Sequence, residues 1–247
     1  MYILNSPLDS FTVFSLIRFE LLGYSLTITN YMLYLFIVFA IIVYGHVLTF
    51  SSNIIYNKWS LAVESSISTI LSIVKEQIGS KYEYYLPLVY TIFFFILIAN
   101  LNGNVPYAFT ATTSLILAIG LSLTVWIGVT SLSLSLHKIQ FFSFFVPLGT
   151  PLPLVAMLAV IETISYIARA FSLGIRLFAN MTAGHTLLNI LSGFLYPLLT
   201  WTGFIILVVP GTIFIALVGL EIAVSFIQSF VFTLLLCSYL KDAIYLH

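Results

Sequence analysis

Six ionisable side chains lie within two long apolar stretches near the end of the sequence. They are Glu162, Arg169, Arg176, His185, Glu221 and Asp242. A charge at the centre of a membrane helix costs about 2.5–3.5 kcal/mol on insertion scales, so such residues usually have a function. Carboxylates and imidazole exchange protons near neutral pH, whereas a guanidinium stays protonated. This set of side chains predicts proton transfer through a membrane, with buried structural ion pairs as the alternative.

The spacing of these residues predicts two polar stripes. Glu162, Arg169 and Arg176 follow one another at intervals of seven residues. That interval returns to nearly the same face of a helix, so the stripe extends over about 21 Å. The shared face on the second stretch holds Glu221, Ser225 and Gln228.

If the two stretches fold antiparallel about position 202, the stripes meet at matching depths. The pairs expected are Glu162 with Asp242, Arg176 with Gln228, and His185 with Glu221. Arg176 then lies between two protonatable clusters. Its permanent charge would attract a deprotonated carboxylate and interrupt a continuous proton path. Because no carboxylate of this chain shares its depth, we expect that carboxylate on another protein.

The composition excludes several other classes. Of the 247 residues, 61% are hydrophobic and only 6% are charged, against about 25% charged in soluble domains. The net charge is zero without a basic cluster, which argues against nucleic-acid binding. Cys237 is the only cysteine, so neither an internal disulfide nor a cysteine metal cluster is expected. No phosphate loop or paired-histidine motif is present, and we expect no cofactor and no metal.

Apolar runs of about 18 or more residues predict helices that cross about 30 Å of hydrocarbon. One run covers residues 28–50, after an N-terminal segment of about 25 residues, and a transmembrane hairpin covers 84–101 and 107–136. Residues 56–78 differ, because apolar residues recur at helical spacing and charged residues fill the other faces. This pattern predicts an amphipathic helix on the membrane surface, with a soluble helix packed on a partner as the alternative.

The charged stretches predict two unusually long helices, at residues 152–196 and 204–243. Pro197 would then lie just beyond the end of the first helix. Shorter spans, broken near Pro197 and Pro210, are the alternative. No internal repeat or linker divides the chain, which we treat as one domain. The expected fold is an all-α integral membrane protein, with three or four transmembrane or surface helices followed by a long, tilted antiparallel hairpin.

The lysines predict the orientation. With these spans, five of them fall on one side of the membrane: Lys58, Lys75, Lys81, Lys138 and Lys241. By the positive-inside rule that side is the cytoplasm or the mitochondrial matrix, and the N-terminus lies on the opposite side. Arg18 is the exception.

Several segments resemble subunit a of the F-type ATP synthases. They are GIRLFANMTAGH at 174–185, ETISYIAR at 162–169, NLNGNVPYAFT at 100–110 and GLEIAVSFIQ at 219–228. The segment around Arg176 is highly specific, and the likeness covers most of the chain. The N-terminal NSPLD at 5–9 resembles the fungal mitochondrial members, some of which lose a short leader.

The resemblance implies a stator subunit of a proton-driven ATP synthase, which is not an enzyme on its own. It implies a multi-pass protein of the mitochondrial inner membrane, with its N-terminus toward the intermembrane space and its C-terminus toward the matrix. The implied partners are the c-ring proteolipid oligomer, the peripheral stalk, other membrane subunits and lipid, within a dimeric complex.

The resemblance also implies roles for individual residues. Arg176 matches the essential arginine that faces the ring carboxylate. The matrix half-channel would hold Glu162 and Asp242, and the intermembrane-space half-channel would hold His185 and Glu221. The polar neighbours would be Asn180, Gln228 and Arg169. The alternatives are a proton-coupled carrier, a proton-pumping subunit of a respiratory complex, or a structural anchor.

Overall fold

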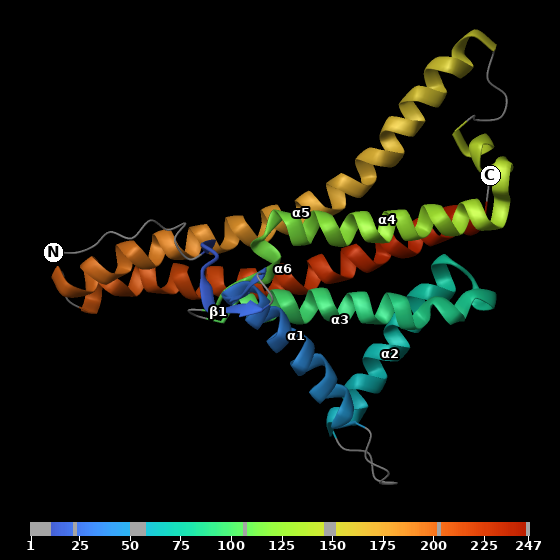
Figure 1. Ribbon diagram of the computed structural model, residues 1–247. Helices are drawn as coiled ribbons and strands as arrows, with labels where there is room; N and C mark the ends of the chain where they lie inside the picture. The colour runs from blue at the N-terminus through green and yellow to red at the C-terminus, as the bar shows by residue number, and fades with distance from the viewer. Residues whose placement is uncertain are drawn as a thin grey trace.

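The computed structural model describes residues 11–21, 24–49, 58–105, 108–145, 152–201 and 204–245. The helices of this part are α1 (Asn30–Val47), α2 (Lys58–Gln77), α3 (Leu86–Gly103), α4 (Leu115–His137), α5 (Leu152–Trp201) and α6 (Phe204–Ile244) (Figure 1). The short 3-10 helices are η2 (Ser80–Tyr85), η3 (Ala111–Thr113) and η4 (Lys138–Phe145). The predicted all-α membrane fold that ends in a long antiparallel hairpin is confirmed.

Five segments of the described residues are long and apolar enough to cross a membrane. They are Asn30–Val47, Ser80–Gly103, Leu115–Phe145, Leu154–Leu195 and Val208–Ile244. Little of this apolar surface is covered by the chain itself: within the most apolar part of each span, the buried share runs from 6% to 28%. The remaining surface must therefore contact lipid or other proteins.

The N-terminal segment contains a β-hairpin, which the sequence interpretation missed. Strands β1 (Ser15–Leu21) and β2 (Tyr24–Thr29) pair antiparallel. Strand β2 runs directly into α1, and the side chain of Asn30 accepts a hydrogen bond from the backbone N–H of Phe14. Because strand pairing continues through residue 29, α1 begins two residues later than the predicted span.

Helix α2 covers most of the predicted amphipathic segment. Its apolar residues Ile70 and Val74 are buried against α3 and α6. Its first turn is tied to α1, because Trp59 donates from Nε1 to the carbonyl of Gly45 at 2.9 Å. Part of the apolar stripe is thus covered by the chain itself. The position of α2 at the membrane surface stays a prediction.

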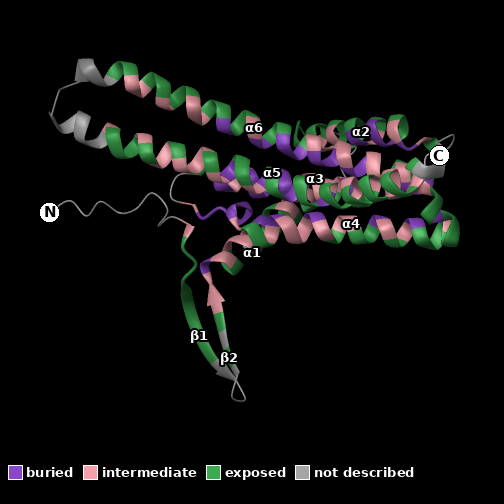
Figure 2. Cartoon of the chain, turned by 90° about the horizontal axis from the view of Figure 1, so that it is seen from above, coloured by how far each residue is buried: buried purple, intermediate pink, exposed green. Residues whose placement is uncertain are grey.

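The site is held by α3, α4, α5 and α6, which lie side by side (Figure 1). Gly174 lets α5 approach α4 closely, because a Cβ there would lie 2.8 Å from the carbonyl oxygen of Ala118. Leu173 and Leu177 are consequently buried between α5 and its neighbours. Figure 2 shows that buried residues gather along these facing sides, whereas the end of the hairpin near its turn is largely exposed.

The two long helices are continuous over 50 and 41 residues. Helix α5 continues through Pro197 to Trp201, so the prediction that this proline lies beyond the helix end is wrong. Pro210 likewise lies inside α6. A proline removes one backbone hydrogen bond, and membrane helices tolerate that loss more readily than soluble helices do.

Candidate functional site

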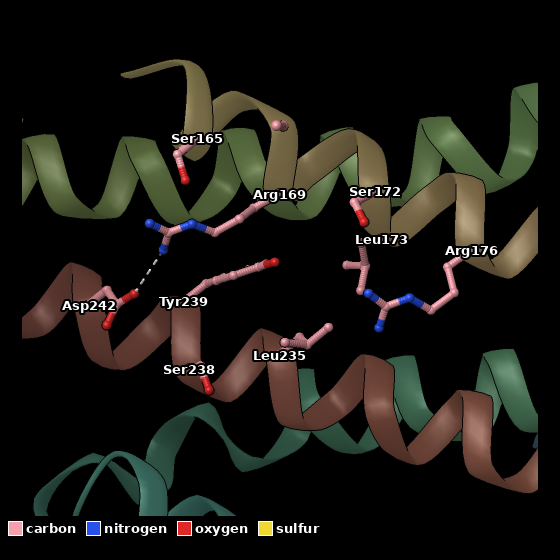
Figure 3. Close-up of a pocket in the computed structure, with 10 residues that line it drawn as sticks. Ser165, Arg169, Ser172, Leu173, Arg176, Leu235, Ser238, Tyr239 and Asp242 are labelled. Carbon is pink, nitrogen blue, oxygen red and sulfur yellow. Dashed lines mark hydrogen bonds and ion pairs between the residues drawn. The ribbon is translucent and has the colours of Figure 1, made fainter. Parts of the chain in front are cut away.

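A cavity of about 470 Å³ lies between α5 and α6 (Figure 3). The name inner cavity is used for it below. Its walls carry both arginines of the α5 stripe, the carboxylate of Asp242 and several hydroxyl groups. The lining residues are Ser165, Ala168, Arg169, Ser172, Leu173, Arg176, Leu235, Ser238, Tyr239 and Asp242.

Arg169 holds the two acids of the inner cavity region. Its Nη2 lies 3.1 Å from Oε1 of Glu162, and its Nη1 lies 3.5 Å from Oδ2 of Asp242. The structure thus corrects the predicted pairing of Glu162 with Asp242, because the arginine lies between them. Two carboxylates repel each other at short range, and a guanidinium with a planar fork of donors can bind both.

Arg176 is an exposed residue at the other end of the inner cavity. Figure 3 shows its side chain leaving α5 on the same side as Arg169, toward α6. Within the described part of the chain, Arg176 makes no ion pair and no hydrogen bond. The two arginines therefore share a helix face and a cavity, but in the described part of the chain Arg169 alone has carboxylate partners.

One helical turn beyond Arg176, a polar bridge joins α5 to α6. Asn180 donates from Nδ2 to Oε1 of Gln228 at 2.8 Å, and Gln228 is buried. The sequence predicted that Arg176 lies level with Gln228. In the structure, Gln228 is hydrogen-bonded to Asn180 instead. Equal-depth pairing assumes straight, parallel helices, whereas the first part of α5 diverges from α6 (Figure 1).

His185 and Glu221 lie together on the outer part of the hairpin. Nε2 of His185 lies 3.5 Å from Oε1 of Glu221, and the two side chains are 15% and 6% exposed. Neither atom has a hydrogen-bond partner within the described residues. Gly184 makes this approach possible, because a Cβ there would lie 2.9 Å from Oε1 of Glu221.

A second cavity, of about 650 Å³, opens beside His185. It is called the outer cavity below, and it lies between the segment that holds Phe11 and Phe14, the α3–α4 connection and the hairpin. Its lining residues are Phe11, Phe14, Asn30, Tyr34, Asn104, Val105, Ala108, Phe109, Thr110, His185, Leu188, Asn189, Ser192, Phe214 and Val218. The inner and outer cavities share no lining residue.

Buried apolar side chains occupy the hairpin between the two cavities. Leu177 and Met181 of α5 and Phe232 of α6 are at most 1% exposed. They leave the bridge between Asn180 and Gln228 as a polar contact in this region. Within the described residues, the six charged side chains therefore form two clusters and one unpaired arginine.

The amino-acid sequence matches the model of one known protein family. The family model described as ATP synthase A chain matches residues 32–241. The chain belongs to this family.

Similar proteins of the family cover the whole chain. The ATP synthase subunit a of Mycosarcoma maydis is 56% identical, over 100% of this chain and 99% of its own length. That of Vanderwaltozyma polyspora is 44% identical over 100% of both chains. That of the alga Chondrus crispus is 39% identical, over 100% of this chain and 98% of its own.

The structure adds residues to the site that the sequence analysis did not identify. The inner cavity adds Tyr239 and the hydroxyls of Ser165, Ser172 and Ser238. Asn104 donates from Nδ2 to Oγ of Ser225 at 3.0 Å and so joins the end of α3 to α6. The serines at 165 and 172 could have been found, because they lie four and three residues from the arginines on the same helix face.

Proposed function

We propose that this chain is the proton-translocating stator subunit of a rotary F-type ATP synthase. The inner and outer cavities act as two offset half-channels that lead to carboxylates on a c-ring. Protons enter by one half-channel, travel on the ring and leave by the other. The membrane potential contributes about 2.3 kcal/mol per charge per 100 mV to this movement.

In the outer half-channel, His185 and Glu221 pass protons toward the ring. In the inner half-channel, Asp242 and Glu162 receive them, with Arg169 holding both acids in position. Asn180 and Gln228 align the two helices one turn from Arg176. The His185 imidazole, in a site where the described residues form no cluster of acidic ligands, favours protons over sodium ions.

The observation that carries the proposal is the guanidinium of Arg176, which lies at one end of the inner cavity, apart from the outer cavity, and has no partner among the described residues. An isolated charge in a membrane is costly, so a partner is expected. A ring carboxylate that passes Arg176 would lose its proton there, because the cation stabilises the ionised form. The same charge repels a proton that would pass directly between the half-channels.

The setting of the proposal is the mitochondrial inner membrane. The N-terminus lies toward the intermembrane space, and the inner cavity faces the matrix with the lysines. The partners are the c-ring, the peripheral stalk, other membrane subunits and lipid, in a dimeric complex. The chain does not bind ATP itself.

The test is Arg176→Ala in the complete ATP synthase, reconstituted into lipid vesicles. We expect an assembled complex whose proton-driven ATP synthesis falls at least about a hundredfold, the scale on which a placed charge contributes to a reaction. Arg18→Ala is the control, because Arg18 is exposed on β1 and bonded to Ser15. Normal synthesis by an assembled Arg176→Ala complex would refute the proposed function.

A further inference from the structure

Four hydroxyl groups face the inner cavity without a hydrogen bond to any described residue. They belong to Ser165, Ser172, Ser238 and Tyr239. Elsewhere on α6, hydroxyls donate to the carbonyl about one turn earlier, as Ser229 does to Phe226 and Thr233 does to Phe230. The cavity hydroxyls, without a partner among the described residues, can therefore bind water. A polar cavity of about 470 Å³ has room for several waters.

Tyr239 occupies the middle of this cavity. Its ring extends from α6 between the Asp242 end and the Arg176 end, and its hydroxyl points into the space between the two arginines (Figure 3). Behind the ring, toward α4 and η4, the gap beside Asp242 measures only about 10 Å³, too little for a row of waters. Tyr239 therefore walls off that gap on one side and offers a hydroxyl to the cavity on the other.

A phenol hydroxyl suits this place. It accepts a hydrogen bond and donates one at the same time, so it can join two waters without becoming charged. Between Arg169 and Arg176, the other lining side chains are two serines and two leucines. Of the hydroxyls in this stretch, that of Tyr239 lies farthest from its backbone, and it points toward the guanidinium of Arg176 (Figure 3).

We propose that the hydroxyl of Tyr239 is a positioning group for proton exit, which orders the waters that connect Arg176 with Asp242. This inference rests on the proposed function, and it assigns the inner half-channel a residue beyond its acids. The proton moves along the waters from the ring carboxylate to Asp242. The Tyr239 hydroxyl donates and accepts hydrogen bonds, and it stays a neutral phenol throughout.

The test compares Tyr239→Phe with the unchanged complex, in vesicles, by ATP-driven proton pumping in H2O and D2O. We expect an assembled complex that pumps about fivefold more slowly, the effect of one lost hydrogen bond. We also expect a larger solvent isotope effect, because proton passage through the inner half-channel, which ATP-driven pumping uses in the reverse direction, then limits the rate. Loosened packing would lower the yield of complex and leave the isotope effect unchanged. Tyr90→Phe is the control. Tyr90 lies on α3, outside the inner cavity, and the substitution removes a hydroxyl that is hydrogen-bonded to His46 of α1.

Tyr239→His decides between ordering and packing, because imidazole also donates and accepts. We expect it to restore most of the rate; a His variant that pumps no faster than the Phe variant, or that fails to assemble, overturns the inference. Asp242→Asn separates this inference from the proposed function. Normal pumping by Tyr239→Phe beside slow pumping by Asp242→Asn overturns only the role of Tyr239. Normal pumping by both variants overturns the inner half-channel as well.

Discussion

The two ends of the α5–α6 hairpin carry their acids in different surroundings. At the inner end, Glu162 and Asp242 share the permanent charge of Arg169, and the three side chains are 34–37% exposed. At the outer end, Glu221 is 6% exposed and lies beside His185, a group that can lose its charge. A buried charge is stable only when it is paired, so the outer end must gain and lose charge as a unit.

The difference indicates how each end handles a proton. At the inner end, Arg169 forms ion pairs with both acids, and each acid is more than a third exposed. The outer pair is stable either as imidazolium with carboxylate or as neutral imidazole with carboxylic acid. Arg176 lies between these ends without a carboxylate partner in the described residues. The hairpin thus holds one permanent cation, Arg169, in ion pairs with acids of this chain, and leaves another, Arg176, able to bind a carboxylate of a partner protein.

The largest effect on this comparison is expected from Glu221→Gln. The amide keeps the shape of the buried side chain and cannot carry a proton. Proton-driven ATP synthesis should fall by about a hundredfold, the lower end of what a positioned acid or base contributes. The measurement is synthesis by purified complexes in vesicles under an imposed proton gradient.

Glu64→Gln provides the matched control, because Glu64 lies exposed on α2. The control should keep the unchanged rate. A Glu221→Gln complex that is as fast as the control would remove the outer pair from the proton path.

At the inner end, Asp242→Asn should have a smaller effect, because Glu162 remains bound to Arg169. We expect proton flux to fall about tenfold, the factor that corresponds to 1.4 kcal/mol. Asp242→Glu restores the charge and should recover most of the flux. An Asn variant slower than Glu221→Gln would reverse the proposed ranking of the two ends.

The approach of Glu221 to His185 can be changed without touching either residue. Gly184→Ala places a methyl group 2.9 Å from Oε1 of Glu221 and displaces the carboxylate. We expect proton flux to fall about threefold, which corresponds to well under 1 kcal/mol. Gly193→Ala on the same helix is the control, because a Cβ there has nothing within 4 Å. Equal flux in the two variants would show that the distance between His185 and Glu221 is unimportant.

The sequence predicted the parts of this hairpin that depend on helical periodicity. The seven-residue interval from Glu162 to Arg169 puts an acid and a base on one face, and the two side chains do form an ion pair. The interval does not say which of two arginines binds Asp242, because that depends on how α5 is inclined to α6. Tyr239 was missed for a related reason: a tyrosine among apolar residues has the same pattern whether it faces lipid or a cavity.

The N-terminal hairpin was missed because a hydrophobic segment before a membrane span has more than one interpretation. In β1, Arg18 and Glu20 alternate with apolar neighbours, which is the period of a strand. Strand pairing needs a partner, and β2 overlaps the start of the apolar run that predicts α1. The helix could therefore be expected from composition, whereas its first residue was decided by backbone pairing.

The smallest effect is expected at the joint between α3 and α6, near the outer end. Asn104→Ala removes the 3.0 Å hydrogen bond to Ser225, whose hydroxyl also donates to the carbonyl of Glu221. Hydrogen bonds between membrane helices contribute about 0.6 kcal/mol on average, so proton flux should change by about two- to threefold. Ser225→Ala should have a similar effect, and the double variant should be no worse than either single one. Fully additive losses would mean that Asn104 and Ser225 act separately, and that the outer pair is held without help from α3.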